Sequence, residues 1–325
     1  MQRKEVAMSR MCYILAMLLI GMLTLSCEHK ELCIDHSHIV DLKVDFDWRL
    51  APEANPKSMT IYLFSEDGTN PQRYELNGRD GGTIRVTPGV YHAIYLNSDT
   101  RNIDCRDTKH LSTFLITTKD EDLNTMATNL GMGFYLPRSR GAEDERIVRM
   151  PELLWSGNRH NIYVDRYAEN TVTLSPQKSV MKVSITIEGV KNLNTVSGMI
   201  GTLSGLSEGI LADAGIGSDR CVTMPFTIAR GEDDTTLIAE ILSFGDCTSG
   251  EENHFLDLYV VLADGSRWNY RYDVTSQVHS ATDKTHIHII LDELPIPDIG
   301  GTGESGGGFI PSIDEWNTVE IGIQM

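Results

Sequence analysis

The sequence predicts an all-β fold, with two tandem antiparallel β-sandwich domains that follow a lipoprotein signal. In several segments, apolar and polar side chains alternate with a period of two, as in half-buried strands. Gly, Pro, Asn and Asp separate these segments at short intervals, a spacing typical of sandwiches rather than of βαβ units. A short apolar segment that ends in a cysteine stands near the N-terminus.

This apolar segment, residues 11–27, reads MCYILAMLLIGMLTLSC and follows the basic residues Arg3, Lys4 and Arg10. A basic start, a short apolar run and a small residue at the exit are typical of a secretory signal. Ser26-Cys27 resembles the cleavage site of a bacterial lipoprotein. We therefore expect residues 1–26 to be a signal peptide and Cys27 to carry acyl chains such as palmitate. An uncleaved anchor and a plain signal peptide are the alternatives.

The charge of the chain excludes one class of partner. The 325 residues carry a net charge of −18, which becomes −20 once residues 1–26 are removed. So acidic a surface repels nucleic acid and anionic lipid headgroups. We predict no nucleic-acid partner, and attachment to a membrane through acyl chains rather than through a basic patch.

Four cysteines lie beyond the signal and its exit: Cys33, Cys105, Cys221 and Cys247. An exported protein meets an oxidising compartment, so these four allow up to two disulfides. None has the CxxC spacing of a zinc site. We predict a disulfide between Cys221 and Cys247, and the alternative is that all four are unpaired and buried.

The first part of the exported chain, residues 27–38, is expected to be a tether. It contains His29, Asp35, His36 and His38, which are residue types that bind divalent ions. A solvated leader explains the same residues without a metal, and this is our interpretation.

Residues 39–174 are expected to form the N-terminal sandwich. Val40 to Trp48 alternates strictly, which predicts a half-buried strand. Further strands are expected at Met59–Phe64, Arg73–Leu76, Thr83–Val86, Val90–Leu96, Thr113–Thr117, Asn161–Val164 and Thr171–Leu174. Asp120–Asn129 reads as a short helix or a loop, and Pro137–Arg146 reads as an exposed loop.

Residues 175–325 are expected to form the C-terminal sandwich. Strands are predicted at Val180–Ile187, Val222–Ala229, Thr236–Phe244, Phe255–Leu262, Arg267–Tyr272 and Thr285–Leu291. Asp264-Gly265 is a strong hairpin signal between two of them. Val196–Gly217 reads as irregular, with a strand near Met199-Ile200.

The C-terminus combines a flexible linker with a predicted strand. Residues 300–308, GGTGESGGG, have the composition of a flexible linker. The alternating Val319, Ile321 and Ile323 predict a final strand. This strand could pair in its own domain, cover an edge elsewhere or join another subunit.

No motif of the sequence indicates catalysis. His286 and His288 share a strand face, with Asp283 nearby, but a polar outer face explains them without a metal. The acidic pairs Asp233-Asp234 and Glu251-Glu252 lack the spacing of a calcium loop. We predict no catalytic residues, no metal site and no cofactor. Paired carboxylates of the glycosidase type are the alternative.

Five segments together resemble the fimbrillin-like lipoproteins of Bacteroidetes, of the type V pilus, within an uncharacterised-domain branch. They are CEHKELC, VDLKVDFDW, TVTLSP, LDLYVVLADGS and GGGFIPSIDEWNTVEIGIQM. The resemblance implies sandwiches of transthyretin-like type and a lipid anchor in the outer membrane, with display at the cell surface. It implies a fimbrial subunit, anchor or tip component with an adhesive or structural role.

The resemblance also implies partners. In such pili a protease removes the N-terminal strand at a basic residue, and the open groove accepts a strand from the next subunit. Arg49 is the candidate cut site here, and Arg138 and Arg140 are exposed alternatives too deep in the chain to free a single strand. The expected partners are other pilus subunits, through strand exchange, and host or bacterial surface ligands. The alternative is a surface lipoprotein that binds a glycan or another ligand without polymerising.

Overall fold

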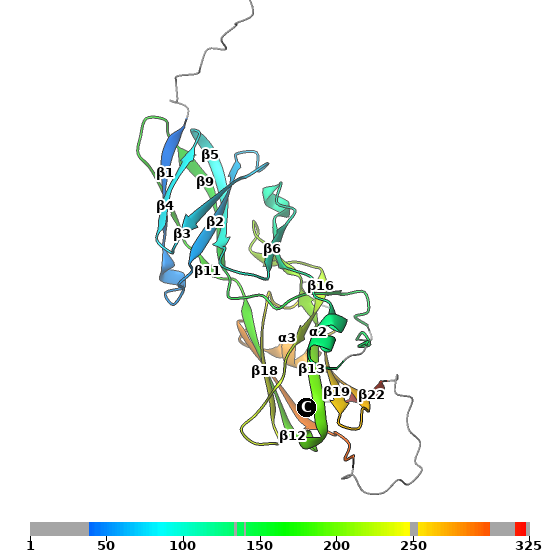
Figure 1. Ribbon diagram of the computed structural model, residues 1–325. Helices are drawn as coiled ribbons and strands as arrows, with labels where there is room; N and C mark the ends of the chain where they lie inside the picture. Colours follow the sequence, from blue (N-terminus) through cyan, green and yellow to red (C-terminus); the bar gives the residue numbers. More distant parts are fainter. Residues whose placement is uncertain (1–38, 133–134, 140, 248–252, 300–315, 323–325) are drawn as a thin grey trace, which may run out of the picture.

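The computed structural model describes residues 39–132, 135–139, 141–247, 253–299 and 316–322. Two β-sandwiches stand end to end in an elongated molecule, with a small sheet between them (Figure 1). The all-β prediction is confirmed. Helices are short: α2 is Leu123–Asn129, α3 is Thr275–Ser280, and the single 3-10 turns are Trp48–Leu50, Leu111–Thr113 and Leu193–Thr195. In the described part of the chain no helix has the length and apolarity that a bilayer crossing requires.

The first sandwich packs a three-stranded sheet against a five-stranded sheet. The order of the smaller sheet is β10-β1-β4 and that of the larger is β11-β9-β5-β2-β3. The strands are β1 (Val40–Phe46), β2 (Ser58–Ser65), β3 (Gln72–Asn77), β4 (Gly81–Val86), β5 (Gly89–Asn97), β9 (Trp155–Val164), β10 (Asn170–Leu174) and β11 (Gln177–Lys178). One apolar core joins the two sheets, and Leu42, Ile61 and Val164 lie at its centre.

The second sandwich packs a four-stranded sheet, β17-β18-β12-β21, against a six-stranded sheet, β22-β20-β19-β13-β16-β8. Its strands are β8 (Arg146–Ile147), β12 (Met181–Val190), β13 (Val196–Ser207), β16 (Cys221–Phe226), β17 (Ala229–Arg230), β18 (Leu237–Ser243), β19 (Phe255–Leu262), β20 (Arg267–Asp273), β21 (His286–Leu294) and β22 (Asn317–Ile321). Tyr270, Tyr272 and Ile289 lie in the core between the sheets.

A third sheet, which we call the bridging sheet, connects the sandwiches. Its order is β15-β14-β7-β6, from β6 (Ile103–Arg106), β7 (Leu115–Thr118), β14 (Gly209–Leu211) and β15 (Ile216–Gly217). The pair β7–β14 is antiparallel and joins strands far apart in the sequence. A separate apolar cluster around Phe64, Phe114 and Ile116 supports this sheet.

A segment from the first half of the chain covers the second sandwich. We call residues 120–147 the strap; it includes α2 and β8. Its side chains Leu123, Leu136 and Ile147 pack on Ile200 and Tyr259, on the outer face of the six-stranded sheet. The outer face of this sheet is therefore buried as well as its inner face.

The division of the chain at residues 174 and 175 stays a proposal. Strands β7 and β8 precede it, but they pair with β14 and β16, which follow it. Strand β11 follows it, but pairs with β9.

The secondary structure or burial predicted for two segments is wrong. Val196–Gly217 is not irregular, because β13 runs through twelve of these residues and is followed by β14 and β15. Pro137–Arg146 is not simply an exposed loop, because Ser139 and Ala142 are buried. The strap packs against a sheet whose outer face the sequence did not predict to be apolar.

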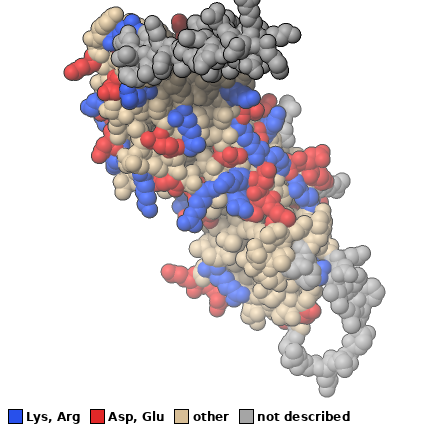
Figure 2. Space-filling model, turned by 45° about the horizontal axis from the view of Figure 1, so that its top comes forward, with Lys and Arg blue, Asp and Glu red and all other residues tan. Residues whose placement is uncertain are grey.

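The surface charge is uneven. On the face in Figure 2, acidic and basic side chains lie over the upper part and the middle of the molecule. The lower part, which belongs to the second sandwich, has few charged side chains on this face.

Candidate functional site

Strand β1 is the central strand of the three-stranded sheet. It pairs in parallel with β10 and antiparallel with β4. Leu42 and Val44 are 1% exposed and Phe46 is 8% exposed, while Asp41 and Lys43 face solvent. The alternation in the sequence therefore corresponds to one buried and one solvated face.

Trp48 continues the buried face beyond the end of β1. Its indole Nε1 donates a hydrogen bond to the carbonyl oxygen of Arg79 at 2.7 Å, and the Arg79 guanidinium lies 5.3 Å from the ring centre. The ring of Trp155 packs edge-on against it at 6.5 Å. The tryptophan fixes the point at which the strand leaves the sandwich.

Arg49, the predicted cut site, follows at once in a single 3-10 turn, Trp48–Leu50. Its side chain is 88% exposed and pairs with Asp47, with Arg49 Nε 2.8 Å from Asp47 Oδ2. The hydrogen bond from Arg49 lowers the pKa of the Asp47 carboxyl below its ordinary value. The backbone bond that closes the turn runs from the Ala51 N–H to the Trp48 carbonyl.

The alternative cut site Arg138 is partly buried rather than exposed. Its guanidinium donates to the carbonyl oxygen of Glu145 within the strap. The expectation that Arg138 is exposed is therefore wrong. Arg140 lies outside the described residues.

The C-terminal strand β22 lies at the edge of the six-stranded sheet, parallel to β20. Of the three arrangements left open by the sequence, the structure has the pairing within the second sandwich. Val319 and Ile321 are partly buried against the core. Trp316 donates from Nε1 to the carbonyl oxygen of Tyr135 at 2.8 Å, and its ring lies 5.5 Å from that of Tyr259.

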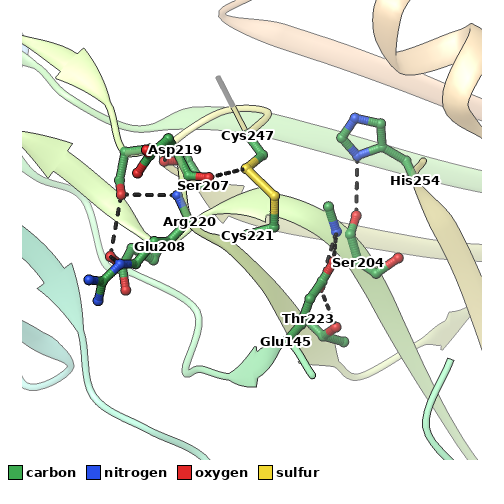
Figure 3. The surroundings of a disulfide bond; sticks show 12 residues. Glu145, Ser204, Ser207, Glu208, Asp219, Arg220, Cys221, Thr223, Cys247 and His254 are labelled. Carbon is green, nitrogen blue, oxygen red and sulfur yellow. Dashed lines mark hydrogen bonds and ion pairs between the residues drawn. A yellow bond between two sulfur atoms is a disulfide. The ribbon is translucent and has the colours of Figure 1, made fainter. Parts of the chain in front are cut away.

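A disulfide joins Cys221 to Cys247, the pair named from the sequence (Figure 3). Their Cα atoms are 5.4 Å apart, and they stand 26 positions apart in the chain. Cys105 carries a free thiol whose pKa burial raises to about 11. Cys27 and Cys33 lie outside the described residues.

Beside the disulfide, a carboxylate of the strap reaches the six-stranded sheet (Figure 3). Glu145 accepts hydrogen bonds from the Gly205 N–H at 3.2 Å and from Thr223 Oγ1 at 2.7 Å. Further along the strap, Arg146 Nη1 lies 2.7 Å from the buried carboxylate of Glu208. These contacts attach the strap to the second sandwich from two neighbouring positions.

Of the histidines considered in the sequence as metal ligands, the structure describes His286 and His288. The rings of His286 and His288 lie 3.9 Å apart on the outer face of β21, and His286 Nε2 is 2.8 Å from Ser184 Oγ. Among the described residues, no group of three or more His, Cys, Asp or Glu side chains is placed to hold a metal ion. His29, Asp35, His36 and His38 lie outside the described residues.

A family model described as a domain of unknown function, DUF5119, matches residues 26–227. The chain belongs to this family. No curated protein matches it.

Solved structures share the fold. A candidate adhesin from Bacteroides ovatus is 20% identical, with a TM-score of 0.57 over 84% of this chain and 99% of that one. A candidate polysaccharide-binding protein (DUF1812) from Bacteroides thetaiotaomicron is 13% identical, with a TM-score of 0.48 over 77% and 90%. The fimbrial anchor protein Mfa2 from Porphyromonas gingivalis is 13% identical, with a TM-score of 0.46 over 78% and 90%. The family match and the fold shared with the Bacteroides ovatus adhesin candidate confirm, at the level of fold, the fimbrillin-like resemblance.

Proposed function

We propose that this DUF5119 protein is a cell-surface lipoprotein with an adhesive or structural role in a pilus, and that it performs no catalysis. In this proposal Cys27 carries the lipid that holds the protein at the outer membrane. An acylated N-terminal Cys27, detected by mass spectrometry of protein extracted from membranes, tests the anchor. A freely secreted product without acyl mass contradicts it.

The observation that supports a pilus role most directly is the place of β1. It is the central strand of its sheet, yet it is the first described strand of the chain, so one cut behind it separates it from everything that follows. Its removal would leave β4 and β10 as two unpaired edges on either side of an apolar groove. Such a groove is a template for a strand from another chain.

The cost of emptying this groove explains why exchange would need a replacement strand. Burial of a Leu, Val or Phe side chain contributes about 1.5–3 kcal/mol each, and β1 buries Leu42, Val44 and Phe46. After cleavage, β1 would therefore stay bound until a strand with the same alternation displaced it. Val319 and Ile321 of β22 have this alternation, and β22 is an edge strand held by one neighbour.

Arg49 suits cleavage because its side chain is exposed and the turn around it is closed by a single backbone hydrogen bond. A short 3-10 turn opens at little cost, which gives a protease access to an extended backbone. The adhesin description of the Bacteroides ovatus structure agrees with this proposal.

Limited digestion with an arginine-specific protease tests the proposal. We expect cleavage of the wild-type protein after Arg49, release of the N-terminal strand and a ladder of higher oligomers on gels of unheated samples. Arg49→Gln abolishes both the cut and the ladder. The matched control Arg138→Gln changes neither.

A ladder that persists in Arg49→Gln, or a wild-type protein that is cut at Arg49 and stays monomeric, contradicts the exchange. A monomeric product would favour the second candidate, a surface lipoprotein that binds a glycan or another ligand. A polar cleft between the sandwiches is the observation that favours it.

A further inference from the structure

A cleft of about 500 Å³ lies where the two sandwiches and the bridging sheet meet. Its walls come from β9, β10 and β11 of the first sandwich, from β14 and β15 of the bridging sheet, and from residues 244–246 and 284–285 of the second sandwich. This volume lies within the range of small-molecule sites, roughly 300–1,000 Å³. The position between domains is also a common one for ligand sites.

Hydroxyl and amide groups line this cleft. They belong to Ser156, Asn158, Thr173, Gln177, Ser179 and Thr285. Hydroxyl and amide side chains donate and accept hydrogen bonds in several directions, as the hydroxyls of a sugar ring require. Some of these groups already bond within the protein, Ser156 with Ser179 and Thr285 with Asp283. Their oxygens keep lone pairs that can accept further hydrogen bonds, which a saccharide supplies and an apolar segment does not, so the lining favours a saccharide.

The charges in the cleft have the opposite sign to the chain as a whole. Arg159, Lys178 and Lys284 line it, against one carboxylate, that of Asp246. Lys284 Nζ lies 3.8 Å from Asp246. Among the ion pairs of the described residues, none includes Arg159 or Lys178. Two unpaired cations in a chain of net charge −18 make a local site for an anion.

The walls of the cleft are fixed before any ligand arrives. Asn158 Nδ2 donates to the carbonyl oxygens of Ala212 at 2.8 Å and Asp213 at 3.0 Å, which ties β9 to the bridging sheet. The Tyr95 hydroxyl donates to the Ser175 carbonyl and accepts from the Ser175 N–H. A site of this kind loses little conformational entropy when it binds a ligand.

We propose that this cleft binds an acidic saccharide, with the carboxylate or sulfate of the sugar between Arg159 and Lys178. The hydroxyl and amide side chains of the walls hydrogen bond the ring hydroxyls. This inference rests on the proposed adhesive role, because it names the class of ligand that such a surface protein recognises. It needs neither cleavage at Arg49 nor polymerisation.

Calorimetric titration of the purified full-length protein tests the site with three probes. They are a galacturonic acid trisaccharide, a sulfated galactose trisaccharide without a carboxylate, and a neutral galactose trisaccharide. We expect at least one acidic probe to bind, and the neutral probe to bind at least about tenfold more weakly. Added salt weakens the acidic probe because it screens exposed cations. Binding of the carboxylate probe alone, or of the sulfate probe alone, identifies the acidic group that the site takes.

The variant Arg159→Gln with Lys178→Gln should lower the affinity for the acidic probe by at least about tenfold. The matched control, Lys43→Gln with Arg85→Gln, removes two cations from the outer face of β1 and β4 and should change the affinity by less than about twofold. Equal losses in both variants would show a non-specific charge effect and overturn the proposal.

Failure to bind either acidic probe at about 1 mM overturns it as well, and so does a neutral probe that binds as tightly as the acidic ones. These outcomes are independent of the oligomer ladder. If the protein forms a ladder but binds no acidic sugar, the proposed pilus role stands and the proposed ligand site in the cleft is rejected. If the protein binds the acidic sugar but forms no ladder, the proposed ligand site stands and the proposed strand exchange is rejected.

Discussion

The two sandwiches differ in how many faces of their sheets are buried. In the first, the small sheet buries one face only. On its other face Asp41 and Lys43 are exposed to water, and Asp45 is partly exposed. In the second, the six-stranded sheet is buried on both faces, because the strap covers the outer one. In the proposed exchange the first sandwich is therefore the one that releases a strand, whereas a segment from the first half of the chain covers the second sandwich.

The two sandwiches also differ in the burial of their charged side chains. Under the strap, Arg271 Nε lies 2.9 Å from Asp257 Oδ1, and Ser139 also donates to Asp257. Asp257 is fully buried, and this burial raises the pKa of its carboxyl. On the first sandwich, Lys43 Nζ and Asp45 form an exposed pair at 3.1 Å. A buried pair and a surface pair with similar distances should therefore respond very differently to mutation.

The largest effect is expected when the buried pair is broken. Asp257→Ala leaves the Arg271 guanidinium buried without its carboxylate, which costs about 3–5 kcal/mol in the free energy of unfolding. Asp45→Ala, the matched change on the first sandwich, costs less than about 1 kcal/mol because water solvates the freed Lys43. Urea denaturation curves of both variants measure the contrast. Equal losses in the free energy of unfolding would contradict the prediction, because they would mean that breaking the buried pair costs no more than breaking the exposed one.

A somewhat smaller effect is expected from the disulfide. Replacing Cys221 and Cys247 together by Ser removes a constraint on a loop of 26 residues, worth about 3.5 kcal/mol in the chain-entropy account. Cys105→Ser, at a free thiol in strand β6 of the bridging sheet, is the control for the loss of a sulfur atom. Thermal unfolding of the double variant and of the control, under oxidising and reducing conditions, separates the loss of the disulfide from the loss of a sulfur atom. Wild-type protein that loses no stability on reduction would contradict the prediction.

The smallest effect is expected from acid, and it should be local to the strap. The hydrogen bond from Arg146 lowers the pKa of Asp120, and the backbone N–H of Thr125 lowers that of Asp122, the N-cap of α2. Both carboxylates therefore stabilise the folded strap above their ordinary pKa of 3.8, and this stabilisation is lost as the pH falls through their lower folded values. Burial acts in the opposite direction on Asp257, so overall stability is not the right measure.

Hydrogen exchange of the α2 amides below about pH 4, relative to those of β5, is the measurement for this prediction. Because the intrinsic exchange rate of an amide itself falls with pH, the quantity to compare is the protection factor, and acid should lower that of the α2 amides first. Asp122→Asn should show less change with pH, because its side chain does not titrate. Protection factors of the α2 amides that are the same at neutral and acid pH would count against the role of these carboxylates.

Sequence reasoning worked best where one face of a strand meets water. The alternation of β1 in the sequence is the alternation of its burial. The hairpin between β19 and β20 was predicted because Asp264-Gly265 is a strong turn signal, and Gly265 has φ +85°. In both cases the local sequence is sufficient to determine the local structure.

The same reasoning failed where burial comes from distant parts of the chain. In β13, residues 200–207 are all buried, so no alternation remains to be read. The small residues that looked irregular are required by packing: a Cβ at Gly201 would clash with the ring of Phe226, and Gly205 has φ +76°. The strap and the bridging sheet depend on pairings across about 90 residues, such as Ile116 with Ile210, which no local pattern encodes. The cleft was missed for the same reason, since its walls come from both sandwiches and from the bridging sheet.

The bridging sheet has a mechanical consequence. The sandwiches are not joined by one flexible chain, because the β7–β14 ladder and the strap both cross from the first half of the chain to the second. A tensile force applied at one end of the molecule is therefore shared among several parallel connections, and bending about the junction must break backbone hydrogen bonds. We therefore expect the two sandwiches to move as one stiff unit. With the proposed anchor at Cys27, such a unit would hold the cleft at a fixed height above the membrane.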